Sequence, residues 1–233
     1  RMPSKKIKKR KFNIREKFNE IVKRNIEKMK QFNKKTNNYD VGININYEDS
    51  RKLNSIPDNS IDLMITSPPY GDSKTTVAYG QYSRPALWWL DLPQISRKNI
   101  NQVDKNLLGG KKANKNFENE LPSITLRKTL NVIKEKDINR ARDVYSFYKD
   151  LNLSIKKITD KMKINSYQFW VVGNRTVKGE KLLTHRIIKE LGKSYGLIDV
   201  YDIPRNIPNK VMPSANSPTN EIGKKVSTMC NEH

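Results

Sequence analysis

The chain has 233 residues, enough for one ordinary domain with or without an insertion, and 46 Lys and Arg against 24 Asp and Glu give it a formal net charge of +22. This charge disfavours an enzyme of neutral small molecules. It predicts a polyanionic partner, most simply a nucleic acid such as double-stranded DNA, although a lysine- and asparagine-rich proteome would produce the same bias.

Cysteine and histidine are scarce. Cys230 is the single cysteine, and His185 and His233 are the two histidines. A disulfide within the chain is therefore excluded, and no metal site is expected. No apolar run approaches the roughly 20 residues of a membrane span, and no hydrophobic segment follows the basic N-terminal residues as in a signal peptide. We expect a reducing, cytoplasmic setting and no membrane partner.

Residues 1–40 predict a basic helical arm. Apolar residues recur at helical spacing with Lys and Arg between them, so we predict an amphipathic helix over about residues 14–34. The basic run Lys5–Lys11 favours an arm that contacts DNA phosphates; a solvated surface helix is the alternative.

Residues 41–92 carry the patterns of a small α/β core. The stretch "VGININY" at 41–47 alternates apolar and polar residues and predicts a strand. The apolar run "IDLMITS" at 61–67 predicts a buried parallel strand. The stretch "RPALWWLDL" at 84–92 predicts a helix that begins near Pro85.

The rest of the chain divides into an irregular segment and a second region of regular elements. Residues 93–125 are rich in Gly, Lys and Asn and predict an inserted loop suited to target recognition. Residues 126–233 complete the core. In chain order we predict a helix from Leu126 to about Met162 and a strand over 167–174 that ends in Gly-Asn. A helix over 184–196 that stops at Gly196 follows, and then a strand over 197–205. A loop over 207–223 precedes a last strand. Strands that alternate with helices predict an α/β fold with a mainly parallel sheet.

The segment Ser67-Pro68-Pro69-Tyr70 stands where the predicted strand 61–67 ends. Ligands of open α/β sheets bind beyond the carboxyl ends of the strands. The Ser67 hydroxyl and the Pro68 carbonyl can accept hydrogen bonds from an exocyclic amine, and Tyr70 can stack on a planar ring. Two prolines hold these groups still before binding. A rigid proline turn without any chemistry is the alternative.

The strand, this tetrapeptide and the sequences around it resemble S-adenosylmethionine-dependent DNA amino-methyltransferases of restriction-modification systems. The resemblance rests on "DSRKLNSIPDNSIDLMITSPPYGDSKTTVAYGQYSR" and on "FWVVGNRTVKG", "IPNKVMPS" and "SPTN", and it covers most of residues 43–230. Members of this family carry Asp, Asn or Ser before Pro-Pro-Tyr, and the serine form is typical of enzymes that methylate N4 of cytosine. The resemblance implies a Rossmann-like sheet with helices on both faces.

The resemblance also implies a mechanism. A cytosine flipped out of the duplex would stack on Tyr70 while Ser67 and the Pro68 carbonyl, held by Pro69, orient its N4 amine. The nitrogen would attack the methyl group of S-adenosylmethionine in line, and the two acceptors would stabilise the positive charge that grows on it. Methylation of N6 of adenine and a non-catalytic DNA-recognition subunit remain alternatives.

Further residues receive roles only through the resemblance. Asp49, Thr66 and Ser67 would bind the cofactor, with a loop N-cap as the alternative for Asp49. The DNA-contacting positions would be Asp72, Tyr79, Asn174, Arg175, Arg205 and Lys210, and a solvated surface residue is the alternative for each of them.

Two features of the family have no counterpart in the sequence. No glycine-rich loop of the form Phe-x-Gly-x-Gly follows a predicted strand, and "LLGGKK" at 107–112 does not stand in that context. The family's central strands 1 and 2 have no counterpart before residues 41–47 either. We therefore expect either one half of a split, heterodimeric methyltransferase whose second polypeptide carries the loop and both strands, which we favour, or a fragment of a longer chain.

Overall fold

The computed structural model describes residues 13–36, 41–46, 48–72, 79–90, 96, 99–100, 102–205 and 229–232. The chain divides into two compact units, Arg1–Tyr47 and Glu48–His233. Each unit is described by itself.

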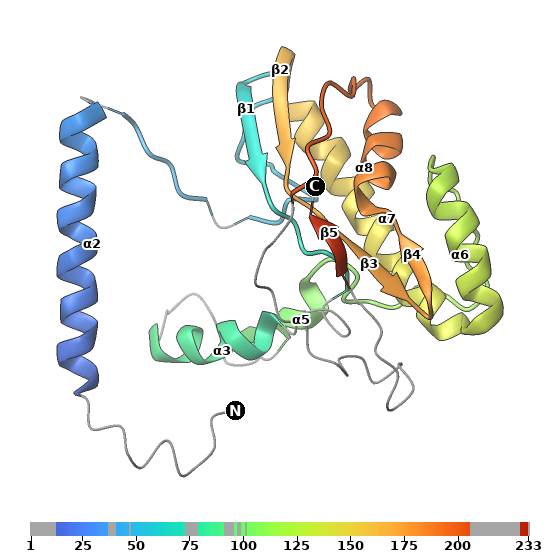
Figure 1. The fold of residues 1–233 in the computed structure, drawn as a ribbon, viewed down its shortest axis with the longest axis horizontal. Coiled ribbons are helices and arrows are strands. Elements are labelled where there is room, and N and C mark those ends of the chain that lie inside the picture. The colour runs from blue at the N-terminus through green and yellow to red at the C-terminus, as the bar shows by residue number, and fades with distance from the viewer. Residues whose placement is uncertain are drawn as a thin grey trace. The chain divides into compact units, whose positions relative to one another are not determined.

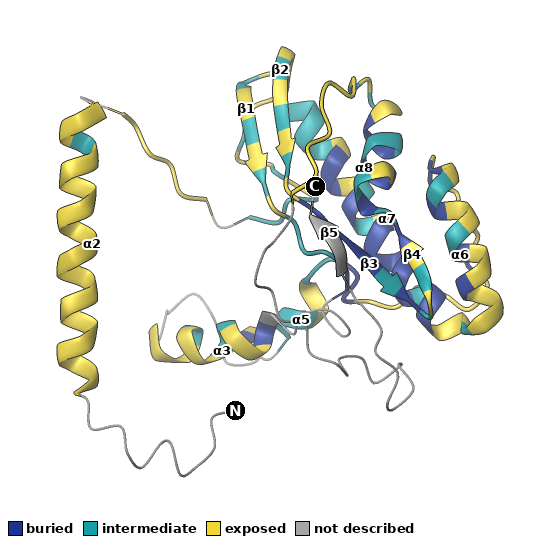
Figure 2. Cartoon of the chain, viewed as in Figure 1, coloured by how far each residue is buried: buried dark blue, intermediate teal, exposed yellow. Residues whose placement is uncertain are grey.

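The described residues of the first unit form one long helix and an irregular segment (Figure 1). The helix α2 spans Ile14–Thr36, which confirms the predicted helix. Asn13 caps it, since its side-chain oxygen accepts the Arg15 backbone N–H at 3.0 Å. None of its residues is buried, and its apolar stripe lies open within this unit (Figure 2).

The prediction of a strand over 41–47 is wrong for residues 41–46, which are the residues of this range that the structure describes. Residues 41–46 form no regular element, and Ile43 and Ile45 are exposed. Alternating residues form a strand only beside another strand that takes up their backbone hydrogen bonds, and none pairs with this segment among the described residues.

The second unit is a mixed α/β structure, and its described residues form two small sheets (Figure 1). Its elements in chain order are β1 (Ile61–Thr66), α3 (Tyr79–Leu90), α5 (Val103–Asn106), α6 (Ile124–Lys136), α7 (Ile138–Lys161), β2 (Met162–Trp170), β3 (Gly173–Val177), β4 (Glu180–Leu182), α8 (Thr184–Lys193) and β5 (Met229–Glu232). No helix in the described part of the chain has the length and apolar content that crossing a membrane requires.

The two sheets differ in strand direction. Strands β1 and β2 pair in parallel, as the prediction of a parallel sheet requires, with Leu63 opposite Tyr167 and Ile65 opposite Phe169. Strand β3 pairs antiparallel with β4 and with β5. The prediction of a mainly parallel sheet is therefore only partly confirmed, because this second sheet is antiparallel.

The β3–β4 hairpin also corrects the strand predicted over 167–174. Strand β2 ends at Trp170, and Gly173 and Asn174 begin β3 instead of ending β2. Lys178 and Gly179 form the turn to β4, both with positive φ (52° and 83°), as tight two-residue hairpin turns require.

A capping residue divides the helix predicted from Leu126 to Met162. Asp137 separates α6 from α7, and its carboxylate accepts the backbone N–H groups of Asn139 and Arg140 at 3.0 and 3.1 Å. Aspartate favours this cap over a helix interior because its side chain competes for backbone donors. The prediction of a single helix is therefore wrong.

The remaining boundaries need smaller corrections. Helix α3 begins at Tyr79, so Pro85 lies inside it and not at its start; the Asp104 carboxylate accepts the Gly80 N–H at 2.9 Å in the first turn. Helix α8 ends at Lys193, and Gly196 (φ 85°) follows as the predicted stop signal.

Of the elements predicted after α8, one strand is wrong and one is confirmed. The strand predicted over 197–205 is wrong: 197–204 has no strand, and Arg205 forms one isolated bridge. A last strand exists as β5, whereas the loop predicted over 207–223 lies outside the described residues.

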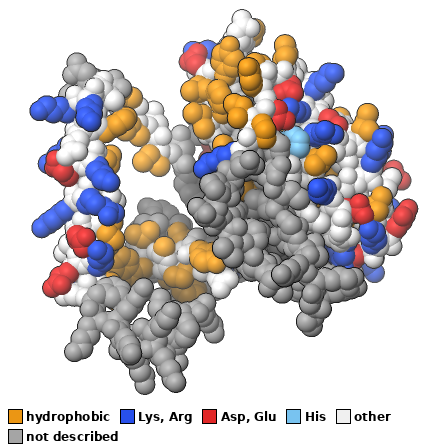
Figure 3. Space-filling model, in the orientation of Figure 1, with side chains coloured by type: hydrophobic (Ala, Val, Ile, Leu, Met, Phe, Trp, Pro, Cys, Tyr) orange, Lys and Arg blue, Asp and Glu red, His pale blue; other side chains and the backbone are white. Residues whose placement is uncertain are grey.

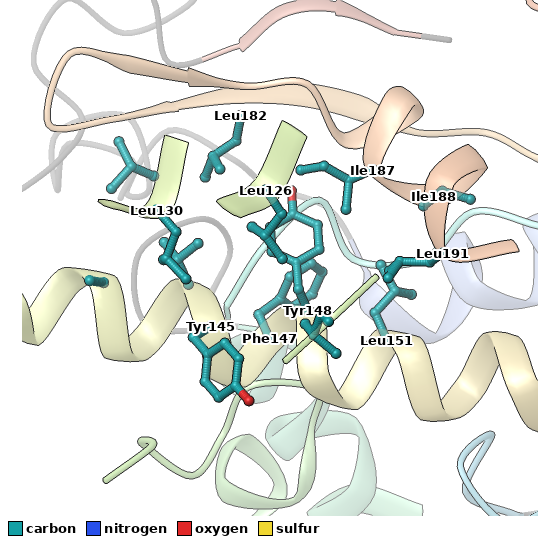
Figure 4. Packing of buried hydrophobic residues seen from close by; sticks show 14 of the residues in the cluster. Leu126, Leu130, Tyr145, Phe147, Tyr148, Leu151, Leu182, Ile187, Ile188 and Leu191 are labelled. Carbon is teal, nitrogen blue, oxygen red and sulfur yellow. The ribbon is translucent and has the colours of Figure 1, made fainter. Parts of the chain in front are cut away.

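The core lies where α7 packs against α6, α8 and the β3–β4 hairpin (Figure 4). Its labelled side chains gather in the space between these elements in Figure 4. The fully buried side chains include Leu126, Leu130, Ile133, Val144, Phe147, Tyr148, Leu151, Ile155, Leu182, Ile187 and Leu191. Trp170 at the end of β2 packs on this core. The carboxyl end of β2 is therefore attached to this core.

Candidate functional site

The Ser67–Tyr70 segment begins at the carboxyl end of β1, as predicted. The Thr66 carbonyl accepts the Val171 N–H at 2.9 Å, so the chain is still held to its neighbour at the last residue of the strand. Ser67 is exposed, whereas Pro68, Pro69 and Tyr70 are half-buried. The Ser67 Oγ and the Tyr70 hydroxyl lie 3.4 Å apart. A hydroxyl and an aromatic ring thus stand together at the strand end.

The chain turns inward directly after this segment. Gly71 is buried, and Asp72 has an exposed fraction of 0%. Its Oδ2 accepts hydrogen bonds from both terminal nitrogens of Arg175 in β3, at 3.3 Å from Nη1 and 3.2 Å from Nη2. Arg140, in the first turn of α7, forms a second ion pair with the same oxygen at 3.7 Å.

These groups belong to a buried charge cluster, defined here as Asp72, Arg140, Asp143 and Arg175. Arg140 Nη1 donates to Asp143 Oδ2 at 3.1 Å, and the half-exposed Lys112 pairs with Asp143 at 3.6 Å. Burial lowers the pKa of Arg175, and the nearby Asp72 carboxylate works against that shift. The cluster thus brings two arginine side chains and two aspartate carboxyl groups together, with each side chain less than a tenth exposed.

Asp72 and Arg175 therefore do not lie on the surface where a DNA contact would need them. Asn174 is also buried, with its Oδ1 2.8 Å from Nδ1 of His185. Arg205 is exposed. The side chain of Tyr79 and all of Lys210 lie outside the described residues. The structure thus brings Asp72 and Arg175 together, but in a contact with each other that the sequence did not predict.

The residues predicted to hold the cofactor do not form a binding cradle by themselves. Asp49 turns its carboxylate toward Arg51, with Oδ1 2.9 Å from Nε and Oδ2 2.6 Å from Nη2. The hydrogen bond from Arg51 is the main cause of the lowered pKa of Asp49, and burial opposes it. Arg51 also pairs with Asp150 at 3.1 Å. Because both oxygens of Asp49 are engaged by Arg51, this residue does not fit the contact to S-adenosylmethionine that was predicted for it.

An apolar surface on β1 and β2 was not predicted. The sequence predicted that β1 is buried, but Leu63 and Ile65 are 53% and 71% exposed, and their neighbours Tyr167 and Phe169 are 59% and 54% exposed. These four side chains share one face of the sheet, because residues two apart on a strand point the same way. Figure 3 shows hydrophobic side chains gathered over β1 and β2. We call these four residues the open sheet face.

The chain is similar to part of a known methyltransferase. The chain is 48% identical over 200 residues to the type II methyltransferase M.MvaI of Kocuria varians. The similarity covers 84% of this chain but only 44% of that protein, so the chain spans less than half the length of this relative. No protein-family profile and no solved structure matches the chain. The Ser-Pro-Pro-Tyr segment therefore occurs in a chain that is similar to part of a methyltransferase.

Proposed function

We propose that this chain is the base-holding part of a DNA methyltransferase of a restriction-modification system, which transfers a methyl group from S-adenosylmethionine to N4 of a flipped cytosine. The observation that carries the proposal is the Ser67–Tyr70 segment at the end of a parallel strand, with an exposed hydroxyl beside a half-buried ring. The similarity to a type II methyltransferase and the net charge of +22 support it.

The side chains of this segment suit an amino group on a planar base. The Ser67 hydroxyl and the Pro68 carbonyl offer two acceptors to the two N–H bonds of the amine, and the prolines add no competing backbone N–H. As positive charge develops on the nitrogen, acceptors that are already in place stabilise it without reorganising. Tyr70 offers its ring for stacking, which every base can use. S-adenosylmethionine would supply the methyl group: its sulfur–methyl bond would break as the nitrogen–methyl bond forms, and the nitrogen would then release one of its amine protons to water.

The contacts to the methyl donor are assigned to a second polypeptide segment. Two observations support this part of the proposal. The open sheet face leaves four large apolar side chains more than half exposed. Strand β1 pairs with β2 along one edge, and no described strand pairs with its other edge. Unpaired edges and apolar faces are the features that a further layer of protein covers. The glycine-rich loop and further strands would therefore lie beside β1.

The test is the identity of the methylated base. DNA is incubated with S-adenosylmethionine and with this chain in complex with the polypeptide that carries the glycine-rich loop, digested to nucleosides and analysed by mass spectrometry. We expect N4-methylcytosine. Detection of N6-methyladenine instead would support a methyltransferase whose target base is adenine. DNA binding without any methylated base would instead favour the DNA-recognition subunit.

A further inference from the structure

The Ser67–Tyr70 segment is attached to the core at both of its ends. At the first end, the Thr66 carbonyl accepts the Val171 N–H at 2.9 Å, which holds the last residue of β1 to the chain just after β2. At the second end, only Gly71 separates Tyr70 from the fully buried Asp72. Two prolines stiffen the chain between these attachments. The position of Asp72 therefore limits where Ser67 and Tyr70 can lie.

The second attachment depends on the charge of Asp72. Arg175 and Arg140 approach the same oxygen, Oδ2, at 3.2 and 3.7 Å, so two guanidinium groups converge on one carboxylate. Without that negative charge the two cations would face each other inside the protein, where their repulsion is poorly screened. Asp143 neutralises Arg140 on its other side, at 3.1 Å. The carboxylate of Asp72 is thus a partner that both buried arginines share.

The two arginines come from different parts of the core. Arg175 belongs to β3, whereas Arg140 lies in the first turn of α7, directly after the Asp137 cap. Each side chain is less than a tenth exposed. A carboxylate bound by both of them is fixed against a sheet and a helix at once.

We propose that Asp72 is a positioning residue, whose ion pairs with Arg175 and Arg140 hold Ser67 and Tyr70 in place without contacting the base or the methyl donor. This role replaces the DNA contact predicted for Asp72 and Arg175 from the sequence. It rests on the proposed function, because it specifies what keeps the base-holding groups of that function still.

The first experiment measures the attachment directly and needs no activity. Hydrogen exchange over residues 66–72 is compared in the wild-type chain, in Asp72→Asn and in the control Glu190→Gln. Asn keeps the size of the side chain but removes the charge. Glu190 is also hydrogen-bonded and partly buried, but it lies in α8 and accepts from Thr125 and Ser123. We expect exchange over 66–72 to be about tenfold faster or more in Asp72→Asn and unchanged in the control.

Unchanged exchange over 66–72 in Asp72→Asn would overturn the proposal, whatever the activity. If Asp72→Asn does not fold, Arg175→Lys replaces it, because lysine keeps the charge but loses the forked contact to Oδ2. This variant is expected to raise exchange over 66–72 by a smaller factor. Wild-type exchange in a folded Arg175→Lys variant would equally refute the role.

The second experiment uses the methyltransferase with its glycine-rich polypeptide present. A misplacement of the amine acceptors by about 1 Å is expected to lower kcat about 100-fold in Asp72→Asn, while KM for DNA stays within about threefold. Glu190→Gln is expected to keep the wild-type kcat. A raised KM with an unchanged kcat would show that Asp72 serves DNA binding and would refute the positioning role. If the wild type transfers no methyl group, the proposed function fails, and the exchange experiment still decides the attachment of Asp72.

Discussion

The substitution Phe169→Ser on the open sheet face tests whether a second polypeptide segment covers β1 and β2. Phe169 is 54% exposed. An aromatic side chain can bury about 200 Å², so about 110 Å² of Phe169 is still open to a partner. At about 25 cal/mol per Å², covering that area contributes about 2.7 kcal/mol. Replacing Phe169 with serine is therefore expected to weaken binding of the partner about 100-fold.

The assay is a calorimetric titration of the chain with the separately expressed polypeptide that carries the glycine-rich loop. Leu153→Ser is the matched control, because Leu153 is 44% exposed but belongs to α7 and not to the open sheet face. The control is expected to bind as the wild type does, and thermal unfolding should show that both variants are folded. Equal affinities for the wild type and Phe169→Ser would refute a cover over this face.

Three further predictions concern single side chains. Tyr70→Ala is expected to lower the methylation rate by about 5- to 150-fold through the loss of roughly 1–3 kcal/mol of base stacking, with little change in DNA affinity by fluorescence anisotropy; a lost affinity with an intact rate would contradict it. Tyr148→Phe removes a buried hydrogen bond of 3.0 Å to Thr184. The free energy of unfolding should fall by about 1 kcal/mol, which corresponds to a decrease of about 2–4 °C in the thermal unfolding midpoint. An unchanged midpoint would show that this hydrogen bond does not stabilise the fold. Burial acts to raise the pKa of Glu190, but the hydrogen bonds from Ser123 and Thr125 outweigh it and leave that pKa lowered. The ionised carboxylate therefore stabilises the fold above its unfolded pKa of about 4.3, and this contribution is lost as pH falls through the lowered folded value. Urea unfolding of Glu190→Gln should accordingly show a smaller loss of stability between neutral and acid pH than the wild type shows, and equal losses would contradict the assignment.

The sequence predicted those features that depend on local residue patterns. Helical spacing located α2 within two residues of its end, and an apolar run followed by Ser-Pro-Pro-Tyr located β1 and its carboxyl end. Both patterns depend only on residues that are close together in the sequence. The parallel pairing of β1 and β2 followed from the alternation of strands and helices.

The features that it missed depend on single polar residues or on distant contacts. Asp137 lies between α6 and α7 and caps the start of α7. The sequence shows this aspartate, but the helical spacing of apolar residues continues across it, so the break was not predicted. Residues 197–205 are rich in Ile, Val and Tyr as strands are, yet no strand forms over 197–204, because pairing needs a partner that the local sequence does not reveal. Arg175 and Asp72 are about a hundred positions apart in the sequence, and no local sequence pattern around either residue predicts their contact.

The double attachment of the Ser67–Tyr70 segment also has a consequence for how a base would enter. A lid closes by exchanging between an open and a closed arrangement, which needs a hinge and a weakly held tip. Here the segment continues a paired strand on one side and ends in a buried ion pair on the other. Its movement would require part of the core to open with it. We therefore expect this receptor surface to exist before DNA arrives, so that the duplex, by extruding its base, makes most of the conformational change at this point.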